Sequence, residues 1–191
     1  MLLSIIKSFN WIDIIILILI LRIAYISASK GLFVEIFKFL GTIFATFICL
    51  HYYTRLGDIF EAIFKIRVIN IEIWDFISFF ILWLIVSGIF VLLRETFFML
   101  VKIESVSIIN KWISFLLGLG RSFIFVSLLM FLLSIPAVDY FKRSVRHSYL
   151  GSRLFFISPS LYKNIWDGFV SKFMPQKELN PAVSEIVKDL K

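Results

Sequence analysis

Residues 11–29 have the sequence WIDIIILILILRIAYISAS, in which Asp13 and Arg22 are the only charged side chains. About 20 consecutive apolar residues are enough for a helix to cross the ~30 Å hydrocarbon layer of a bilayer. Asn10 can cap the start of such a helix, and Asp13 in its first turn suits the positive end of the helix dipole. The segment therefore predicts a first transmembrane helix. The two charges and the apolar run that follows favour a retained helix over a cleaved signal peptide.

Three more apolar segments follow this one, at residues 32–53, 73–98 and 112–138. Hydrophobic residues make up 60% of the chain, whereas soluble domains contain about 45–50%. Gly41 and Ala45 stand four residues apart, a spacing at which small side chains let helices approach closely in lipid. We therefore expect an all-α, multi-pass membrane protein with about four transmembrane helices, which together form a membrane domain over residues 1–138.

The connecting and C-terminal segments have a different character. Residues 54–70 mix charged and apolar side chains three to four apart, which predicts either a short helix on the membrane surface or an ordinary amphipathic connector. Residues 139–173 are basic and aromatic, and they predict amphipathic interfacial helices that contact anionic lipid headgroups. Residues 174–191 contain two prolines and alternating charges, so we expect a flexible polar tail there.

The net charge of +7 does not indicate nucleic-acid binding. Lysine and arginine lie mainly at the ends of the apolar runs, where they meet lipid headgroups, and no phosphate loop, zinc-ligand set or RNA-binding motif accompanies them. The basic residues divide evenly between the two sides of a four-span arrangement, so the positive-inside rule does not orient the chain. Cys49 is the only cysteine, which excludes an intrachain disulfide.

Charged side chains inside the apolar runs are the strongest functional signal, because each is costly in lipid unless it is paired or hydrated. Glu35 and Lys38 are three residues apart and can pair on one helix face. Such groups either line a polar cavity or conduction path, or they reach the headgroups and pair between helices. The second interpretation is favoured for Lys30, Lys38 and Lys102. For Glu35 and Arg121 both interpretations stay open.

The sequence offers little support for an enzyme. His51 and His147 are the only histidines, and neither has a metal-ligand neighbour at helical spacing. No nucleophile motif of the G-x-S-x-G type is present. We therefore expect a non-enzymatic protein without a cofactor or a metal.

Two short motifs within this hydropathy pattern carry a family resemblance. The first is Asp13 followed by an apolar helix and the segment KGLFVE, residues 30–35; the second is Asn110-Lys111 followed by Gly118 and Arg121. In this order the motifs resemble those of the colicin V production protein family, over roughly residues 11–160. The chain departs from the family pattern at Ser114 and Ser122, where glycine is common. Both substitutions are small and keep close helix packing possible.

The resemblance implies a bacterial inner-membrane protein that supports toxin production or export, or envelope maintenance, and it implies no reaction. The expected partners are anionic lipid headgroups of the bilayer and either a second copy of the chain or another membrane protein. One alternative is an oligomeric channel or transporter subunit whose aqueous path is lined by Arg22, Glu35 and Arg121. A second alternative is a lipid-modifying enzyme. The candidate functional residues are Asp13, Arg22, Lys30, Gly31, Glu35, Asn110, Lys111, Gly118 and Arg121.

Overall fold

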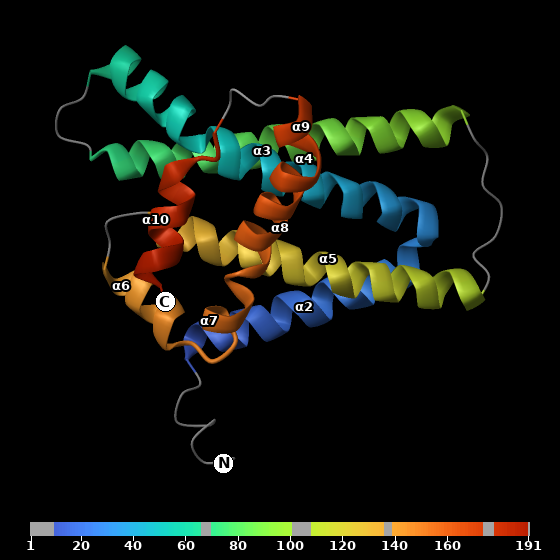
Figure 1. The fold of residues 1–191 in the computed structure, drawn as a ribbon. Helices are drawn as coiled ribbons and strands as arrows, with labels where there is room; N and C mark the ends of the chain where they lie inside the picture. The colour runs from blue at the N-terminus through green and yellow to red at the C-terminus, as the bar shows by residue number, and fades with distance from the viewer. Residues whose placement is uncertain (1–9, 66–69, 101–107, 136–138, 174–177, 191) are drawn as a thin grey trace.

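The computed structural model describes residues 10–65, 70–100, 108–135, 139–173 and 178–190, and these residues are helical with short connections (Figure 1). The four long helices are α2 (Trp11–Lys30), α3 (Leu32–Phe64), α4 (Ile71–Leu100) and α5 (Ile108–Ser134). The shorter elements are α6 (Asp139–His147), α7 (Gly151–Leu154), α8 (Ile157–Ile165), the π-helical turn η1 (Trp166–Val170), α9 (Ser171–Phe173) and α10 (Pro181–Asp189).

Each of the four long helices is long and apolar enough to cross a membrane. The predicted all-α class with four membrane-spanning helices is therefore confirmed. The predicted cap of the first helix is present as well, because the Asn10 side chain accepts from the backbone N–H of Trp11 at 2.7 Å, and the Asp13 carboxylate accepts from the N–H of Asn10 at 2.8 Å. Gly31 separates α2 from α3 with a φ of 85°, a backbone conformation that favours glycine.

The end of the second span differs from the prediction. We expected a span over residues 32–53 and a separate element after it, but α3 continues as one helix to Phe64 and ends at Lys65, which has a φ of 49°. Beyond residue 53, α3 stays packed on α4, and at Gly57 the approach is so close that a Cβ would overlap the side chain of Asp75. The contact with α4 supports α3 beyond the apolar segment, where hydropathy alone predicts a break.

The other two spans lie close to their predicted ranges. The third, expected over residues 73–98, lies within α4, and the fourth, expected over 112–138, starts one turn earlier as α5. The predicted end of the fourth span at residues 136–138 lies outside the described residues.

The part of the chain after residue 138 forms short helices that pack against the long ones. Within residues 139–173, α8 crosses the direction of the long helices (Figure 1), and its location at the membrane interface stays a prediction. The tail was expected to be flexible, and this prediction is wrong for residues 181–189, which form α10. Pro181 begins the helix, Asn180 caps it, and Val183 is buried against the core. A local shortage of apolar residues does not prevent packing when another part of the chain supplies the apolar surface.

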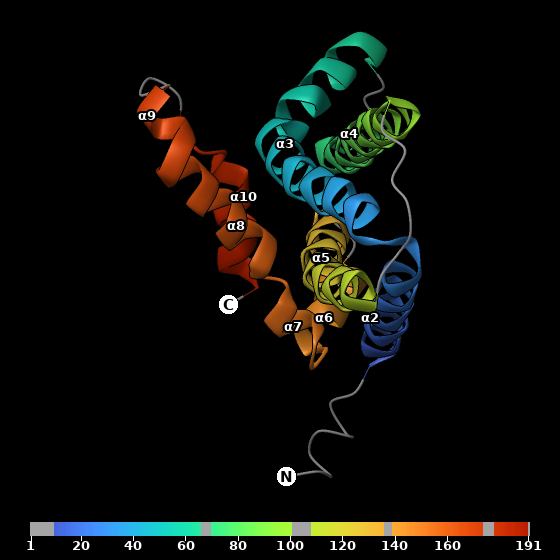
Figure 2. The same cartoon turned by 90° about the vertical axis from the view of Figure 1, so that its right-hand side faces the viewer.

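The long helices pack in an order that leaves α4 and α5 loosely associated. Helix α2 packs mainly on α5, α3 packs on both α4 and α5, and α4 touches α5 little. In the view of Figure 2, α8, α9 and α10 lie on one side of α3 and α5, and α4 lies on the other. Aromatic contacts between Tyr53, Phe79 and Phe131 join α3, α4 and α5 in the core.

Candidate functional site

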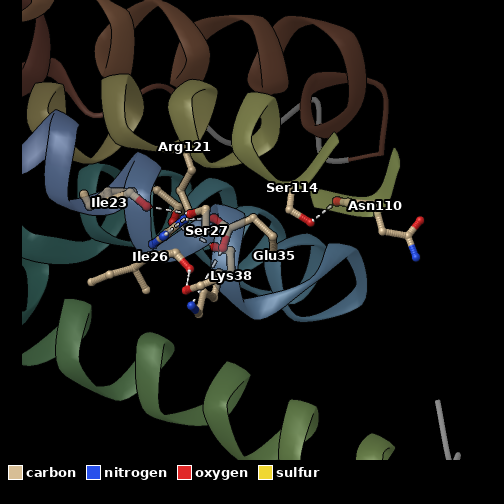
Figure 3. A network of polar contacts seen from close by, with 10 residues as sticks. Ile23, Ile26, Ser27, Glu35, Lys38, Asn110, Ser114 and Arg121 are labelled. Atoms are coloured by element: carbon tan, nitrogen blue, oxygen red, sulfur yellow. Dashed lines mark hydrogen bonds and ion pairs between the residues drawn. The ribbon is translucent and has the colours of Figure 1, made fainter. Parts of the chain in front are cut away.

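A network of charged side chains joins three of the spans (Figure 3). Arg121 on α5 donates from Nε to Oε1 of Glu35 on α3 at 2.5 Å. Lys38, one turn along α3, places its Nζ 3.7 Å from Oε2 of the same carboxylate. The guanidinium also approaches Ser27 on α2, at 3.5 Å from Nη2 to Oγ. The predicted Glu35–Lys38 pair is therefore present, and Arg121 adds the stronger contact to it.

Small residues allow this network to form. A Cβ at Gly118 would overlap the side chain of Ser27, so glycine lets α2 and α5 approach closely one turn before Arg121. The Ser27 hydroxyl donates to the carbonyl of Ile23 at 2.7 Å, which holds this side chain in place. The close approach brings Arg121 within reach of a carboxylate 86 residues earlier in the chain.

The Glu35 carboxylate is buried, and the two cations beside it are mostly buried. Glu35 is fully buried, while the side chains of Arg121 and Lys38 are 14% and 23% exposed. A charge in a membrane span is costly unless it is paired, and here two cations flank one carboxylate. Oε2 of Glu35 accepts no hydrogen bond from the described residues. The network is thus a charged centre with one positive charge more than it has negative charges.

A cavity of about 130 Å³ lies beside this network, between α3, α4 and α5. Lys38 and Arg121 line it together with Arg94 of α4, which also pairs with the exposed Glu95. Aromatic side chains complete its wall, among them Trp83 and Phe125. The cavity is therefore lined by both charged and apolar side chains.

Asp13 forms a second buried polar centre at the opposite end of α2. Its carboxylate accepts from the hydroxyl of Ser148 at 2.7 Å and from the backbone N–H groups of Tyr149 and Leu150 at 3.2 and 2.7 Å. With the bond from Asn10, the fully buried carboxylate satisfies four donors. Charge-assisted hydrogen bonds of this kind are stronger than neutral ones. Asp13 therefore fastens the start of α2 to the connection between α6 and α7.

A comparison with family models identifies the family of the chain. The model described as colicin V production protein matches residues 12–158, which is most of the chain. This chain belongs to the colicin V production protein family. With its four long apolar helices, it is a multi-pass membrane protein. No curated protein and no solved structure matches it.

The two family motifs meet in the structure at the Glu35–Arg121 pair. Gly31 forms the turn that starts α3, Glu35 follows one turn later, and Gly118 and Arg121 face them from α5. Three of the other residues that we predicted to be functional have exposed side chains, namely Lys30, Lys111 and Arg22. Arg22 lies on the outer face of α2, from which its long side chain can reach the headgroups.

Asn110 makes a backbone contact near the start of α5. Its carbonyl accepts from the hydroxyl of Ser114 at 2.6 Å. Ser114 is fully buried, so this colicin V production family member keeps a small residue on the packed face of α5 where glycine is common. Its departure from the family pattern is compatible with close packing.

Sequence reasoning missed a third polar cluster in this family member. The ring nitrogen Nδ1 of His51 lies 2.9 Å from the hydroxyl of Tyr162 on α8, and that hydroxyl accepts from the backbone N–H of Asn180 at 3.1 Å. The Asn180 side chain donates to the carbonyl of Leu50 at 3.0 Å. Burial raises the pKa of Tyr162, so the phenol stays protonated. No sequence pattern pairs His51 with a residue 111 positions away.

At Arg94 the sequence predicts that the span emerges either into the headgroups or into a protein-lined cavity, and the structure places Arg94 in the wall of a cavity. Among the residues that the structure describes, no three His, Cys, Asp or Glu side chains gather in a way that could hold a metal ion.

Proposed function

We propose that the protein is a non-enzymatic component of the bacterial inner membrane that supports colicin V production or export, or the maintenance of the envelope on which export depends. The observation that carries this proposal is the buried Glu35–Arg121 pair, because it joins the two motifs through which the chain resembles its family. A buried charge pair is costly to form in a membrane and strongly destabilising to break, by roughly 3–5 kcal/mol in soluble proteins. Such a pair points to a specific arrangement of α2, α3 and α5 as the working part of the protein.

Complementation tests the proposal. A toxin-producing strain that lacks its own family member is supplied with the natural chain, with Glu35→Gln, or with Arg121→Gln. We expect toxin release per inserted protein to fall about tenfold or more with either variant. Glu35→Gln leaves Arg121 and Lys38 without their carboxylate, and Arg121→Gln leaves Glu35 with only the longer contact to Lys38. Arg22→Gln is the matched control, because it makes the same chemical change on an exposed side chain.

Two results separate a functional role from failed assembly. Membrane-extracted protein is quantified for each variant, and release is compared only at equal amounts of inserted protein. Normal release with both Glu35→Gln and Arg121→Gln would remove the pair from the function. The non-enzymatic part of the proposal expects unchanged headgroup and acyl compositions in the deletion strain, and an altered lipid profile would favour a lipid-modifying enzyme.

An oligomeric channel or transporter subunit is a second candidate, favoured by the charged cavity between α3, α4 and α5. A conduction path in this candidate uses Lys38, Arg94 and Arg121 and leaves out Arg22, which is on the outer face of α2. Flux of anions into liposomes that contain the purified protein tests it. An Arg94→Gln variant should reduce the flux, and liposomes that stay impermeable with the natural chain would exclude the candidate.

A further inference from the structure

The cavity beside the ion network has an excess of positive charge. Three helices each contribute a cation to its wall: Lys38 from α3, Arg94 from α4 and Arg121 from α5. Of the two buried carboxylates among the described residues, only Glu35 lies here, because Asp13 is at the other end of α2. Glu95, which pairs with Arg94, is 54% exposed and lies toward the surface. The chemistry of the wall therefore favours an anion.

The donors that line the cavity suit a phosphate group. A guanidinium carries five N–H donors. Arg121 directs its Nε–H to Glu35 and one N–H of Nη2 to Ser27, so three N–H groups remain for a further acceptor. Arginine recognises phosphate oxygens in a planar, two-pronged geometry, and lysine binds them as a point charge. At about 30 Å³ per water molecule in the liquid, a cavity of about 130 Å³ has room for at least four heavy atoms, which is close to the size of a phosphate.

An apolar groove continues from the cavity along the membrane-spanning parts of α4 and α5. It is lined by Phe79, Phe80, Trp83, Phe125, Leu128, Leu129 and Leu132. Trp83 and Phe125 belong to both walls, and their ring centroids lie 5.8 Å apart. The cationic cavity and the apolar groove therefore adjoin at these two rings, at the place where α4 and α5 touch little.

The two parts also lie at different depths. Lys38 is six residues after the start of α3, and Arg94 is six residues before the end of α4, so both lie about 9 Å from their helix ends. From Arg94 to Phe80 is about 21 Å along α4, which takes the groove well into the span. A ligand that fills both parts has its charge near one membrane interface and its apolar part in the hydrocarbon layer.

We propose that an anionic phospholipid binds between α4 and α5, with its phosphate against Lys38, Arg94 and Arg121 and one acyl chain in the groove. The choice of a lipid follows from charge complementarity at one end and from the wholly apolar lining at the other. In the bilayer, these spans are also surrounded by lipid. The site goes beyond the proposed function and does not depend on which process the protein supports.

Native mass spectrometry tests the site. The full chain is reconstituted in nanodiscs with equal amounts of phosphatidylglycerol and phosphatidylcholine and is then released in the instrument. We expect one phosphatidylglycerol to stay bound in preference to phosphatidylcholine. Arg94→Gln should weaken its retention about tenfold, the scale of one charge-assisted contact, and Arg94→Lys should restore part of it. Arg22→Gln should change nothing, since this arginine is exposed and outside the cavity.

A second pair of variants tests the groove. Phe80 and Phe33 are both 43% exposed, but only Phe80 lines the groove. We expect Phe80→Ala to reduce retention of phosphatidylglycerol and Phe33→Ala to leave it unchanged. Equal retention in Arg94→Gln and Arg22→Gln, or equal retention of the two lipids by the natural chain, would overturn the proposal.

Competition distinguishes a lipid from a free anion. Soluble dihexanoyl phosphatidylglycerol and inorganic phosphate are added at equal concentration to the protein in detergent with bound long-chain phosphatidylglycerol. Displacement by the short-chain lipid alone supports the combined site, because inorganic phosphate has no acyl chain for the groove. Equal displacement by inorganic phosphate would assign the cavity to a free anion and overturn the lipid proposal.

Discussion

At the scale of single residues, the close approach of α2 and α5 and the ion pair between Arg121 and Glu35 depend on each other. Gly118 lets α2 and α5 come together, and Arg121, one turn further on, then reaches Glu35 between them. Replacing Glu35 leaves Arg121 without its carboxylate, and replacing Arg121 leaves Glu35 with Lys38 as its remaining cation. The small residue therefore belongs to the site as much as the charged ones do, although it makes no polar contact of its own.

Two glycines in neighbouring spans allow this dependence to be measured. A Cβ at Gly118 overlaps the Ser27 side chain, whereas a Cβ at Gly88 meets nothing within 4 Å. We expect Gly118→Ala to destabilise the protein by about 1–3 kcal/mol through overpacking. Gly88→Ala, its matched control, should be neutral or more stable by up to about 1 kcal/mol because alanine favours helix. Thermal unfolding in detergent checks both, and equal midpoints for the two variants would contradict the close approach of α2 and α5.

Asp13 is a charged residue in an apolar segment, and the fold shows more contacts for it than the sequence predicts. Its position suits a helix start, and it does accept the N–H of Asn10. The same carboxylate also accepts from Ser148 and from two backbone N–H groups beyond it. Asp13, which belongs to a family motif in the first helix, therefore holds the connection between α6 and α7, about 135 residues later in the chain.

At the scale of elements, α10 is the clearest case of a helix formed by tertiary contacts. Asn180 caps it by accepting from the N–H of Ala182 at 3.2 Å and anchors it by donating to Leu50 and Thr54 of α3. A helix of nine residues is marginal on its own, so its stability comes from this anchor and from buried Val183.

Removing the anchor should release the helix. We expect Asn180→Ala to increase hydrogen exchange of residues 181–189 by about tenfold or more, because it removes a cap and two hydrogen bonds, each worth roughly 0.5–1.5 kcal/mol. Asn164→Ala is the control, since Asn164 is exposed on α8. Mass spectrometry of deuterium uptake in detergent measures both. Unchanged uptake in Asn180→Ala would show that α10 is held by its apolar contacts alone.

At the scale of the whole molecule, the four spans alternate in direction. Figure 1 shows the end of α2 near the start of α3, and the end of α4 on the same side as the start of α5. The short helices α6, α7 and α10 lie at the opposite ends of the spans. The polar network around Glu35 and the cluster around Asp13 therefore belong to opposite halves of the membrane.

Cysteine accessibility tests this arrangement without assuming which side faces the cytoplasm. In a Cys49→Ala background, single cysteines replace Ser29, Lys111, Tyr140 and Ser160, all exposed positions. A maleimide that does not cross membranes should label positions 29 and 111 from one side, and positions 140 and 160 from the other. Labelling of 29 and 140 from the same side would contradict the four-span arrangement.

The sequence by itself determined the class of the protein, the number and order of its spans, and the Glu35–Lys38 pair. These properties are local, since hydropathy and helical spacing act over a few turns of one helix. Even the Asn10 cap and the break at Gly31 follow from neighbouring residues.

Only the tertiary structure decided that Arg121 pairs with Glu35, that Arg22 lies outside the network, that α3 continues to Phe64, and that residues 181–189 pack as a helix. Each of these outcomes depends on which surface of one helix meets which surface of another. In lipid, several pairings between apolar helix surfaces have similar free energies. Small residues, and polar side chains that contact partners far away in the chain, decide which pairing forms.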